Sequence, residues 1–165
     1  MKTIMLRSSP ASSPSPALVC RQVRPLWTIS GATAWLRVDQ ETVLRYIEDG
    51  RLQWAWDIGA RDASRRKIRI WFRSLEAAKA RLLAIRNWPE PDYEPVQVIR
   101  AVIGHQRPTL RGSEAQGILN CDRNLVASLL AAKELRLVSA ALSRHGSPLI
   151  LRESLENFLR RRRIL

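Results

Sequence analysis

The feature that most constrains this chain is an internal repeat with a spacing of 83 residues. Residues 30–52, SGATAWLRVDQETVLRYIEDGRL, align without a gap with residues 113–135, SEAQGILNCDRNLVASLLAAKEL. A Ser-Leu-Glu triplet recurs at residues 74–76 and 154–156, which requires a loop three residues shorter in the second copy. We therefore predict two copies of one structural unit. The identical positions of the long alignment are, in the first copy, Ser30, Ala32, Leu36, Asp39, Val43 and Leu52.

Each copy is predicted to begin with a short helix that ends in a tight turn. This helix covers residues 30–36 in the first copy and 113–119 in the second. Ser30 and Ser113 are the expected N-caps, and Gln116 completes a capping box in the second copy. A serine at this position satisfies a free backbone N–H of the first helical turn.

A second helix follows the turn in each copy. Asp39 is the expected N-cap, and Val43 and Ile47 lie four residues apart, so they share one buried face. Gly50 is placed to end this helix, because glycine accepts the left-handed conformation found just after many helices. The second copy offers the equivalent residues Asp122, Val126 and Leu130.

Strand-like segments and a third helix complete each copy. The strands are predicted at residues 51–58 and 66–72, and again at 135–142 and 147–152, each pair joined as a hairpin. The closing helices are residues 74–87 and 154–163, and their expected inward side chains are Leu75, Ala78, Leu82 and Ile85, then Leu155, Phe158 and Leu159. The fold class is thus mainly α with small β-hairpins (α+β), in two tandem units.

Composition sets the boundaries of these units. Residues 1–24 form a leader whose Ser/Pro/Ala stretch cannot bury apolar area and is expected to be disordered. The first unit is residues 25–88 and the second is residues 108–165. Between them, residues 89–107 open with a proline-rich acidic stretch and are expected to be a linker.

The charge of the chain indicates its class of partner. Lys and Arg number 28 against 15 Asp and Glu, a net charge of +13. Such an excess favours a polyanion, and nucleic acid is the usual one. An anionic membrane surface is the rival partner, and a ribosomal or merely solubilising role is the remaining alternative.

Several classes of function find no support in the sequence. Cys20 and Cys121 are far apart, and His105 and His145 lie beside turn-forming residues, so neither a catalytic nor a metal-binding set can be assembled. We expect no enzyme activity, no cofactor and no small-molecule ligand. We find no apolar run of membrane-spanning length, and we expect a cytoplasmic, nucleoid-associated protein.

The first copy resembles a known family. AWLRVDQETVLRYIEDGRL, residues 34–52, is similar to the helix-turn-helix segment of MerR-like and excisionase-like winged DNA-binding domains; the matching residues are Leu36, Val38, Asp39, Thr42, Val43, Arg45, Ile47, Gly50 and Leu52. The second copy departs from that pattern with Leu125, Ser128 and Lys133. The resemblance covers about four-fifths of the chain when both copies are counted.

The resemblance implies that the second helix of each copy enters the major groove of duplex DNA and that the hairpin, as a wing, contacts the backbone or minor groove. Glutamine suits adenine, arginine suits guanine, and glutamate can accept from cytosine. The alternative is that these are only solvated helix positions. The candidate base contacts are Gln40, Glu41, Thr42, Leu44 and Arg45 in the first copy and Arg123, Asn124 and Ser128 in the second.

The hairpin of the first copy carries the densest positive charge. Its candidate phosphate or minor-groove contacts are Arg61, Arg65, Arg66, Lys67 and Arg69. The second hairpin offers only Arg144, and the run Arg160–Arg163 is either a substitute phosphate clamp or a solvated helix end. Tryptophans could stack on single strands, but Trp54 and Trp56 alternate on one strand and Trp35 holds a helix core position, so core packing is the preferred interpretation.

The leading hypothesis is therefore a sequence-specific double-stranded DNA-binding protein. It would act as a transcriptional regulator or as an excisionase-like architectural factor in DNA recombination, and a mobile-element origin fits the resemblance. A homo-oligomer on DNA is compatible with it. The main alternative is one DNA-binding unit plus a second unit that serves as a protein-interaction or self-association module. RNA binding is a third possibility.

Overall fold

A computed structural model describes residues 24–60, 66–83, 93–104, 107–138 and 149–164 of the 165-residue chain. Within these residues the fold is α+β, with short antiparallel strands and helices of 8–11 residues. The expected leader at residues 1–24 lies outside the described residues, apart from Arg24.

The first half of the chain forms a three-stranded sheet with three helices. The strand order is β1-β3-β2, and both pairings are antiparallel. The elements are β1 (Leu26–Thr28), α1 (Ile29–Leu36), α2 (Gln40–Glu48), β2 (Ala55–Asp57), β3 (Ile68–Trp71) and α3 (Phe72–Leu82). We call this half the first unit.

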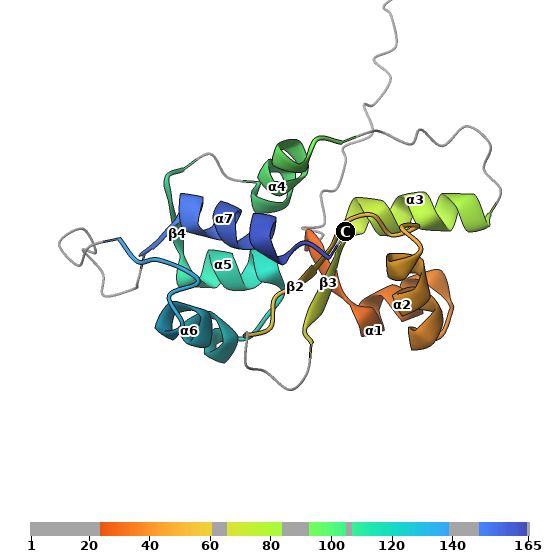
Figure 1. Ribbon diagram of the computed structural model, residues 1–165, viewed down its shortest axis with the longest axis horizontal. Helices are drawn as coiled ribbons and strands as arrows, with labels where there is room; N and C mark the ends of the chain where they lie inside the picture. Colours follow the sequence, from red (N-terminus) through yellow and green to blue (C-terminus); the bar gives the residue numbers. More distant parts are fainter. Residues whose placement is uncertain (1–23, 61–65, 84–92, 105–106, 139–148, 165) are drawn as a thin grey trace, which may run out of the picture.

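The second half repeats that order after an additional helix. Its strands β4 and β5 pair antiparallel, and a single bridge between Leu137 and Ile150 stands where the first unit has β2. The elements are α4 (Pro95–Ile103), β4 (Thr109–Arg111), α5 (Gly112–Leu119), α6 (Arg123–Ala131), β5 (Leu149–Leu151) and α7 (Arg152–Arg162). We call this half the second unit, and Figure 1 shows it to the left of the first.

The two units share one backbone frame, as the repeat predicts. Thr28 pairs with Arg69 in the first sheet, and Arg111 pairs with Leu149 in the second, so shifts of 83 and 80 residues relate the two registers. Each closing helix begins with the same long-range hydrogen bond, in which the N–H of residue 72 or 152 donates to the carbonyl of residue 25 or 108 at 3.0 Å and 2.9 Å. Two different sequences therefore fold onto the same set of main-chain contacts.

Turn geometry repeats as closely. The residue that ends the first helix is left-handed in both units, with φ 58° at Arg37 and φ 47° at Asn120. The residue after the second helix is also left-handed, with φ 73° at Gly50 and φ 57° at Lys133. Gly50 thus ends α2 as predicted, and the second unit places a lysine in a conformation that glycine adopts more readily.

The predicted caps are only partly right. Asp39 and Asp122 cap the second helices: Asp39 Oδ1 accepts from the Thr42 N–H at 2.6 Å. The Ser30 and Ser113 caps are wrong, because the strands run directly into the first helices, which begin earlier. Thr28 caps α1 by accepting from the Gly31 N–H, and α5 instead has the Glu114 carboxylate accepting from the Arg111 N–H at 2.7 Å.

The buried faces agree with the predicted periodicity at most positions. Val43, Ile47, Val126 and the predicted inward residues of α7 are buried. Leu130 is only partly buried, and Leu129 is completely buried instead. Leu82, predicted to point inward, is 49% exposed because α3 extends there past the core; Ile85 lies outside the described residues.

The three-residue difference between the copies is distributed over two places. Ala55 pairs with Ile70 in the first unit, and Leu137 pairs with Ile150 in the second. These pairs are related by shifts of 82 and 80 residues, so one residue is lost between Leu52 and the strand and two are lost in the hairpin. The sequence alone had assigned all three to one loop.

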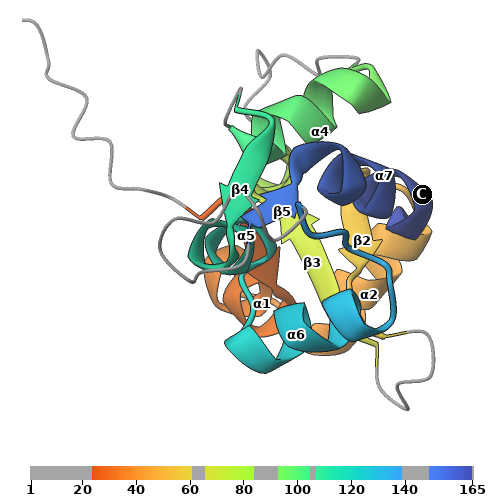
Figure 2. The ribbon, with the colours of Figure 1, turned by 90° about the vertical axis from the view of Figure 1, so that its left-hand side faces the viewer.

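Part of the linker predicted at residues 89–107 is a helix. Pro95 begins α4, and Gly104, with φ 69°, ends it. Its buried side chains Val98, Ile99, Val102 and Ile103 join the core of the second unit. Figures 1 and 2 both show α4 against α7, on the side of the molecule away from α6.

The units also share part of one core, which the domain division did not anticipate. Ala55, Ile68 and Ile70 face the helices of the first unit. Trp54, Trp56, Ile58 and Trp71 lie on the opposite face of the same sheet and pack in a cluster with the second unit. The sheet β1-β3-β2 is therefore buried on both faces and joins the two units.

No helix of the described residues is long and apolar enough to cross a membrane.

Candidate nucleic-acid interface

Helix α2 presents its first turn to solvent. Gln40, Glu41 and Arg45 are exposed, while Thr42 is half-buried and supplies the N–H that Asp39 caps. That hydrogen bond stabilises the ionised carboxylate and lowers the pKa of Asp39 below its ordinary value. Arg45 Nη2 lies 3.4 Å from Thr42 Oγ1. The structure thus brings four of the five predicted α2 residues together on one exposed end. The fifth, Leu44, is half-buried and packs against the core of the first unit.

Helix α6 is arranged in the same way. Asp122 Oδ1 accepts from the Leu125 N–H at 2.7 Å, and Arg123, Asn124 and Ser128 are exposed. The Ser128 hydroxyl donates to the Asn124 carbonyl at 2.9 Å, so it faces along the helix and keeps its acceptor capacity. These three predicted residues therefore also share one exposed face.

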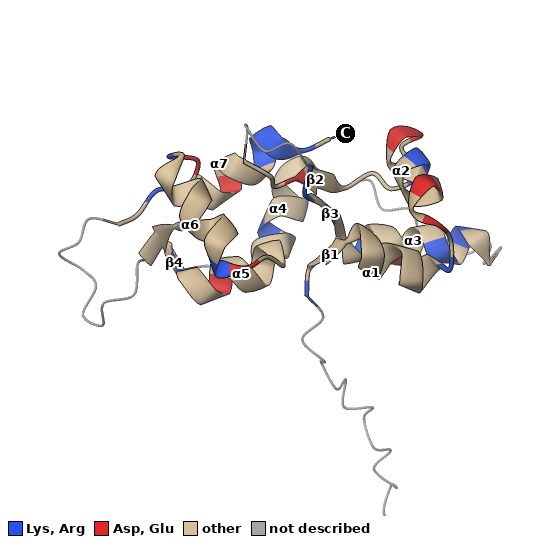
Figure 3. Ribbon diagram, turned by 90° about the horizontal axis from the view of Figure 1, so that it is seen from below, with Lys and Arg blue, Asp and Glu red and all other residues tan. Residues whose placement is uncertain are grey.

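Acidic residues distinguish the two helices. Glu41, Glu48 and Asp49 on α2 are all exposed, and Figure 3 shows the acidic positions along this helix. At the exposed start of α6, the only described residue with a negative charge is Asp122, and its carboxylate caps the helix. The α6 end is consequently the less acidic of the two surfaces.

The hairpin of the first unit is closed by a side chain. Asp57 Oδ1 accepts from the N–H groups of Gly59 and Lys67, each at 3.0 Å. This fixes the base of the hairpin and leaves the side chains of Arg66 and Lys67 exposed. The predicted contacts Arg61, Arg65 and Arg144 lie outside the described residues.

Arg69 does not belong to this exposed set. Its side chain is half-buried, and its guanidinium donates from Nε to the Leu119 carbonyl at 3.0 Å and from Nη2 to the Asn120 carbonyl at 2.8 Å. Burial lowers the pKa of this guanidinium below its ordinary value. Because it lies on the sheet face that contacts the second unit, Arg69 connects the units and is not presented to solvent together with Arg66 and Lys67.

Arg24 reaches the same turn. Its guanidinium donates to the side-chain carbonyl of Asn120. Two arginines of the first unit thereby hold the residue that separates α5 from α6. Arg37, the residue of the first unit that is equivalent to Asn120, is exposed. The packing of the units is therefore asymmetric, since only the second turn is held by its neighbour.

A hollow of about 290 Å³ opens between the hairpin base and the start of α6. Cys121 lies in it, half-buried, and burial raises the pKa of its thiol to about 11, a shift that the nearby charge of Arg69 partly opposes. Arg66 and Lys67 line the hollow on one side and Asp122 on the other. Its remaining lining residues are Ile29, Ile68, Arg69 and Leu125.

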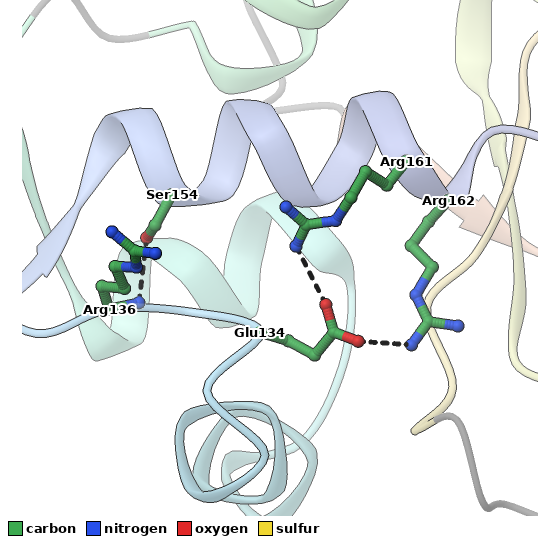
Figure 4. Close-up of polar contacts among 5 residues, drawn as sticks. All are labelled: Glu134, Arg136, Ser154, Arg161 and Arg162. Atoms are coloured by element: carbon green, nitrogen blue, oxygen red, sulfur yellow. Dashed lines mark hydrogen bonds and ion pairs between the residues drawn. The ribbon is translucent and has the colours of Figure 1, made fainter.

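Three of the four C-terminal arginines make contacts within the fold. The Glu134 carboxylate, 8% exposed, accepts from Arg161 at 2.9 Å and from Arg162 at 3.1 Å, as Figure 4 shows. Arg163 lies over the ring of Trp54, 3.8 Å from its centroid, and burial lowers the pKa of Arg163. Of the run proposed as a phosphate clamp, only Arg160 is left on the surface without a role in joining parts of the fold.

The tryptophans support the core interpretation. Trp54, Trp56 and Trp71 are at most 5% exposed, so none of them offers a face to a base. Trp27 and Trp35 are half-buried and pack with Phe72, with ring centroids 5.3–5.7 Å apart. Trp88 lies outside the described residues.

Arg24 and Asn120 matter to the geometry and were absent from the sequence-based site, and Arg163 had been considered there only as part of a phosphate clamp. These three residues hold the two units together. Asn120 was detectable in part, since asparagine tolerates a left-handed turn. Nothing in the local sequence marks the partners of the two arginines.

Within the described residues, no group of three or more His, Cys, Asp or Glu side chains is placed to hold a metal ion. Comparison with protein-family models, with curated proteins and with solved structures found no match for this chain.

Proposed function

We propose that this chain is a sequence-specific duplex-DNA-binding protein with two tandem winged helix-turn-helix units. One observation carries the proposal: α2 and α6 are each the second helix after a left-handed turn, and each presents its capped N-terminal end to solvent. A recognition helix needs that arrangement, because its first side chains reach the base edges. The net charge of +13 supplies the attraction to phosphate.

The exposed residues divide into two roles under this proposal. Gln40 and Asn124 can donate and accept, and Arg45 and Arg123 can donate, at base edges in the major groove. Arg66 and Lys67, at the base of the hairpin, can pair with phosphates or enter the minor groove. MerR-like and excisionase-like proteins, which the α1–α2 segment resembles, regulate transcription or shape recombination sites, and both roles fit this chemistry.

The proposal is tested by selecting duplexes from a random pool and measuring gel shifts over a range of salt. Arg66→Ala with Lys67→Ala should weaken binding to every duplex and reduce the salt slope by about two phosphates. Gln40→Ala or Arg45→Ala should instead cost about 1–3 kcal/mol on the selected duplex alone. Arg100→Ala removes one exposed charge from α4, on the side of the molecule away from α6, and should change neither result.

Glu41 gives the same experiment a second readout. If its carboxylate accepts from a cytosine amino group, Glu41→Gln weakens binding to the selected duplex and relaxes the preference at one position. If α2 does not enter the groove, Glu41→Gln leaves that preference unchanged. Absence of binding to any duplex at low salt would contradict the proposal as a whole.

A second candidate function rests on the composition of α6. Its exposed face carries Ala127, Ser128 and Ala131, which are small and uncharged and allow close approach of another protein. The second unit would then serve self-association or bind a protein partner while the first binds DNA. Light scattering after gel filtration tests this: a dimer that Ala131→Arg dissociates, without loss of duplex binding, would support the second candidate.

A further inference from the structure

We propose that the base of the first unit's hairpin, at Arg66 and Lys67, and helix α6 of the second unit bind the same stretch of duplex and form one composite surface. If the two units bound DNA independently, each hairpin would contact the DNA next to the recognition helix of its own unit. The proposal rests on the proposed DNA binding and adds the arrangement of the contacts. It follows from the way the two units are joined.

The join places the hairpin base next to α6. Arg69, on β3, is bound to the carbonyls of Leu119 and Asn120, in the turn that leads directly into α6. Lys67 is two residues before Arg69, at the open end of the strand, and it faces the same hollow as Asp122. Figures 1 and 2 both show the start of β3 beside α6.

The join is also rigid enough to fix that arrangement. Leu125 and Val126 of α6 are buried in the same apolar cluster as Trp56 and Ile58 of the first sheet. The guanidinium of Arg69 makes several hydrogen bonds in a forked geometry, which restrains both position and angle. The hairpin base and the start of α6 therefore approach a ligand together.

The charges around the hollow suit a phosphate backbone. Exposed Arg66 and Lys67 line the hollow from the first unit. Exposed Arg123, in the second unit, directly follows Asp122, which lines the hollow from the other side. Among the described residues, the acids beside them are Asp122, which caps α6, and Asp57, which accepts from the N–H groups of Gly59 and Lys67. Neither carboxylate needs to be displaced for a phosphate to approach these cations.

Among the described residues, the second unit lacks two features of the first unit's hairpin. The position equivalent to Arg69 is Leu149, and the strand equivalent to β2 is reduced to one bridge at Leu137. Helix α6 also has the less acidic start of the two helices. A basic hairpin from the neighbouring unit thus supplies positive charge to the helix best able to accept DNA beside it.

The test maps each contact on the DNA. A photo-crosslinking amino acid, p-benzoylphenylalanine, is placed at residue 66, 123, 40 or 100 of the full chain. Each protein is bound to a duplex selected from a random pool, of about 40 base pairs or roughly four helical turns. Crosslinked nucleotides are located by primer extension, and residue 100 on α4 serves as the control that should not crosslink.

The composite surface predicts that residues 66 and 123 crosslink within about five base pairs of each other, half a helical turn. Crosslinks from these two residues that are farther apart than that would overturn it, as would residue 66 crosslinking only beside residue 40. Failure of the unmodified chain to retain any duplex is a different result, because it removes the proposed function itself.

Discussion

The guanidinium of Arg69 in the first unit binds the backbone carbonyl of Asn120 in the second, at 2.8 Å from Nη2 and 3.1 Å from Nε. Asn120 has φ 47° and is the left-handed residue that sets the angle between α5 and α6. A hydrogen bond to this carbonyl therefore does more than join two surfaces. It holds the residue that determines where α6 points.

Replacing Arg69 should destabilise the whole chain. Arg69→Leu leaves half-buried carbonyls without their donor, and we expect a loss of about 1–3 kcal/mol in the free energy of unfolding, measured with urea. Arg69→Lys keeps the charge but cannot donate as a fork, so its loss should be intermediate. Arg66→Leu, at an exposed neighbouring position, is the matched control and should change stability by about 0.5 kcal/mol or less. Equal effects at residues 66 and 69 would contradict the structural role of Arg69.

The sequence predicted the features of the fold that local chemistry determines. Asp39 and Asp122 cap their helices, and Val43 and Ile47 face the core, because capping and helical periodicity depend on residues a few positions apart. The contact between Arg69 and the second unit could not be predicted in this way. Its role depends on a neighbour 51 residues away, and a basic run in a hairpin does not reveal which face is covered.

One cue to the covered face was nevertheless present. Trp54, Ala55 and Trp56 are consecutive apolar residues, where a strand with one solvated face would alternate. The structure shows why: Trp54 and Trp56 pack toward the second unit and Ala55 packs toward the first. The helix at residues 95–103 was similarly detectable, since its apolar residues recur at helical spacing between Pro95 and Gly104.

The Glu134 carboxylate should contribute to stability through two arginines at once. Glu134→Ala leaves Arg161 and Arg162 without their shared acceptor, and we expect a loss of about 1–3 kcal/mol on unfolding by urea. Glu134→Gln keeps an acceptor oxygen and should lose less. Glu153→Ala, an exposed acid in the first turn of α7, should lose below about 1 kcal/mol. If Glu134→Ala and Glu153→Ala cost the same, the paired arginines add nothing to stability.

The shared turn geometry predicts opposite effects at equivalent positions. Gly50 has φ 73° and open space around its missing Cβ, so Gly50→Ala should cost about 1 kcal/mol through backbone strain alone. Lys133 has φ 57°, so Lys133→Gly should raise the free energy of unfolding by about 0.5–1 kcal/mol. Gly117→Ala is the control, because Gly117 is helical with equally open space, and it should stabilise α5 by roughly the helix-propensity difference of 1 kcal/mol. Thermal or urea unfolding of the three variants checks the signs, and a stabilising Gly50→Ala would contradict the turn geometry.

The Cys121 thiol should make stability fall at alkaline pH. Burial raises its pKa in the folded protein to about 11 from the ordinary 9.0, so between these values the folded chain holds a proton that the unfolded chain has released. The contribution is complete below the unfolded pKa and is lost as pH rises toward the folded one. The measurement compares the urea midpoints of the native chain and Cys121→Ser from about pH 8 to about pH 11, with a reductant present, since other groups titrate alike in both proteins and cancel. The native chain should lose stability relative to the variant over this range, and a difference that stays constant with pH would mean that the thiol is not buried as the structure places it.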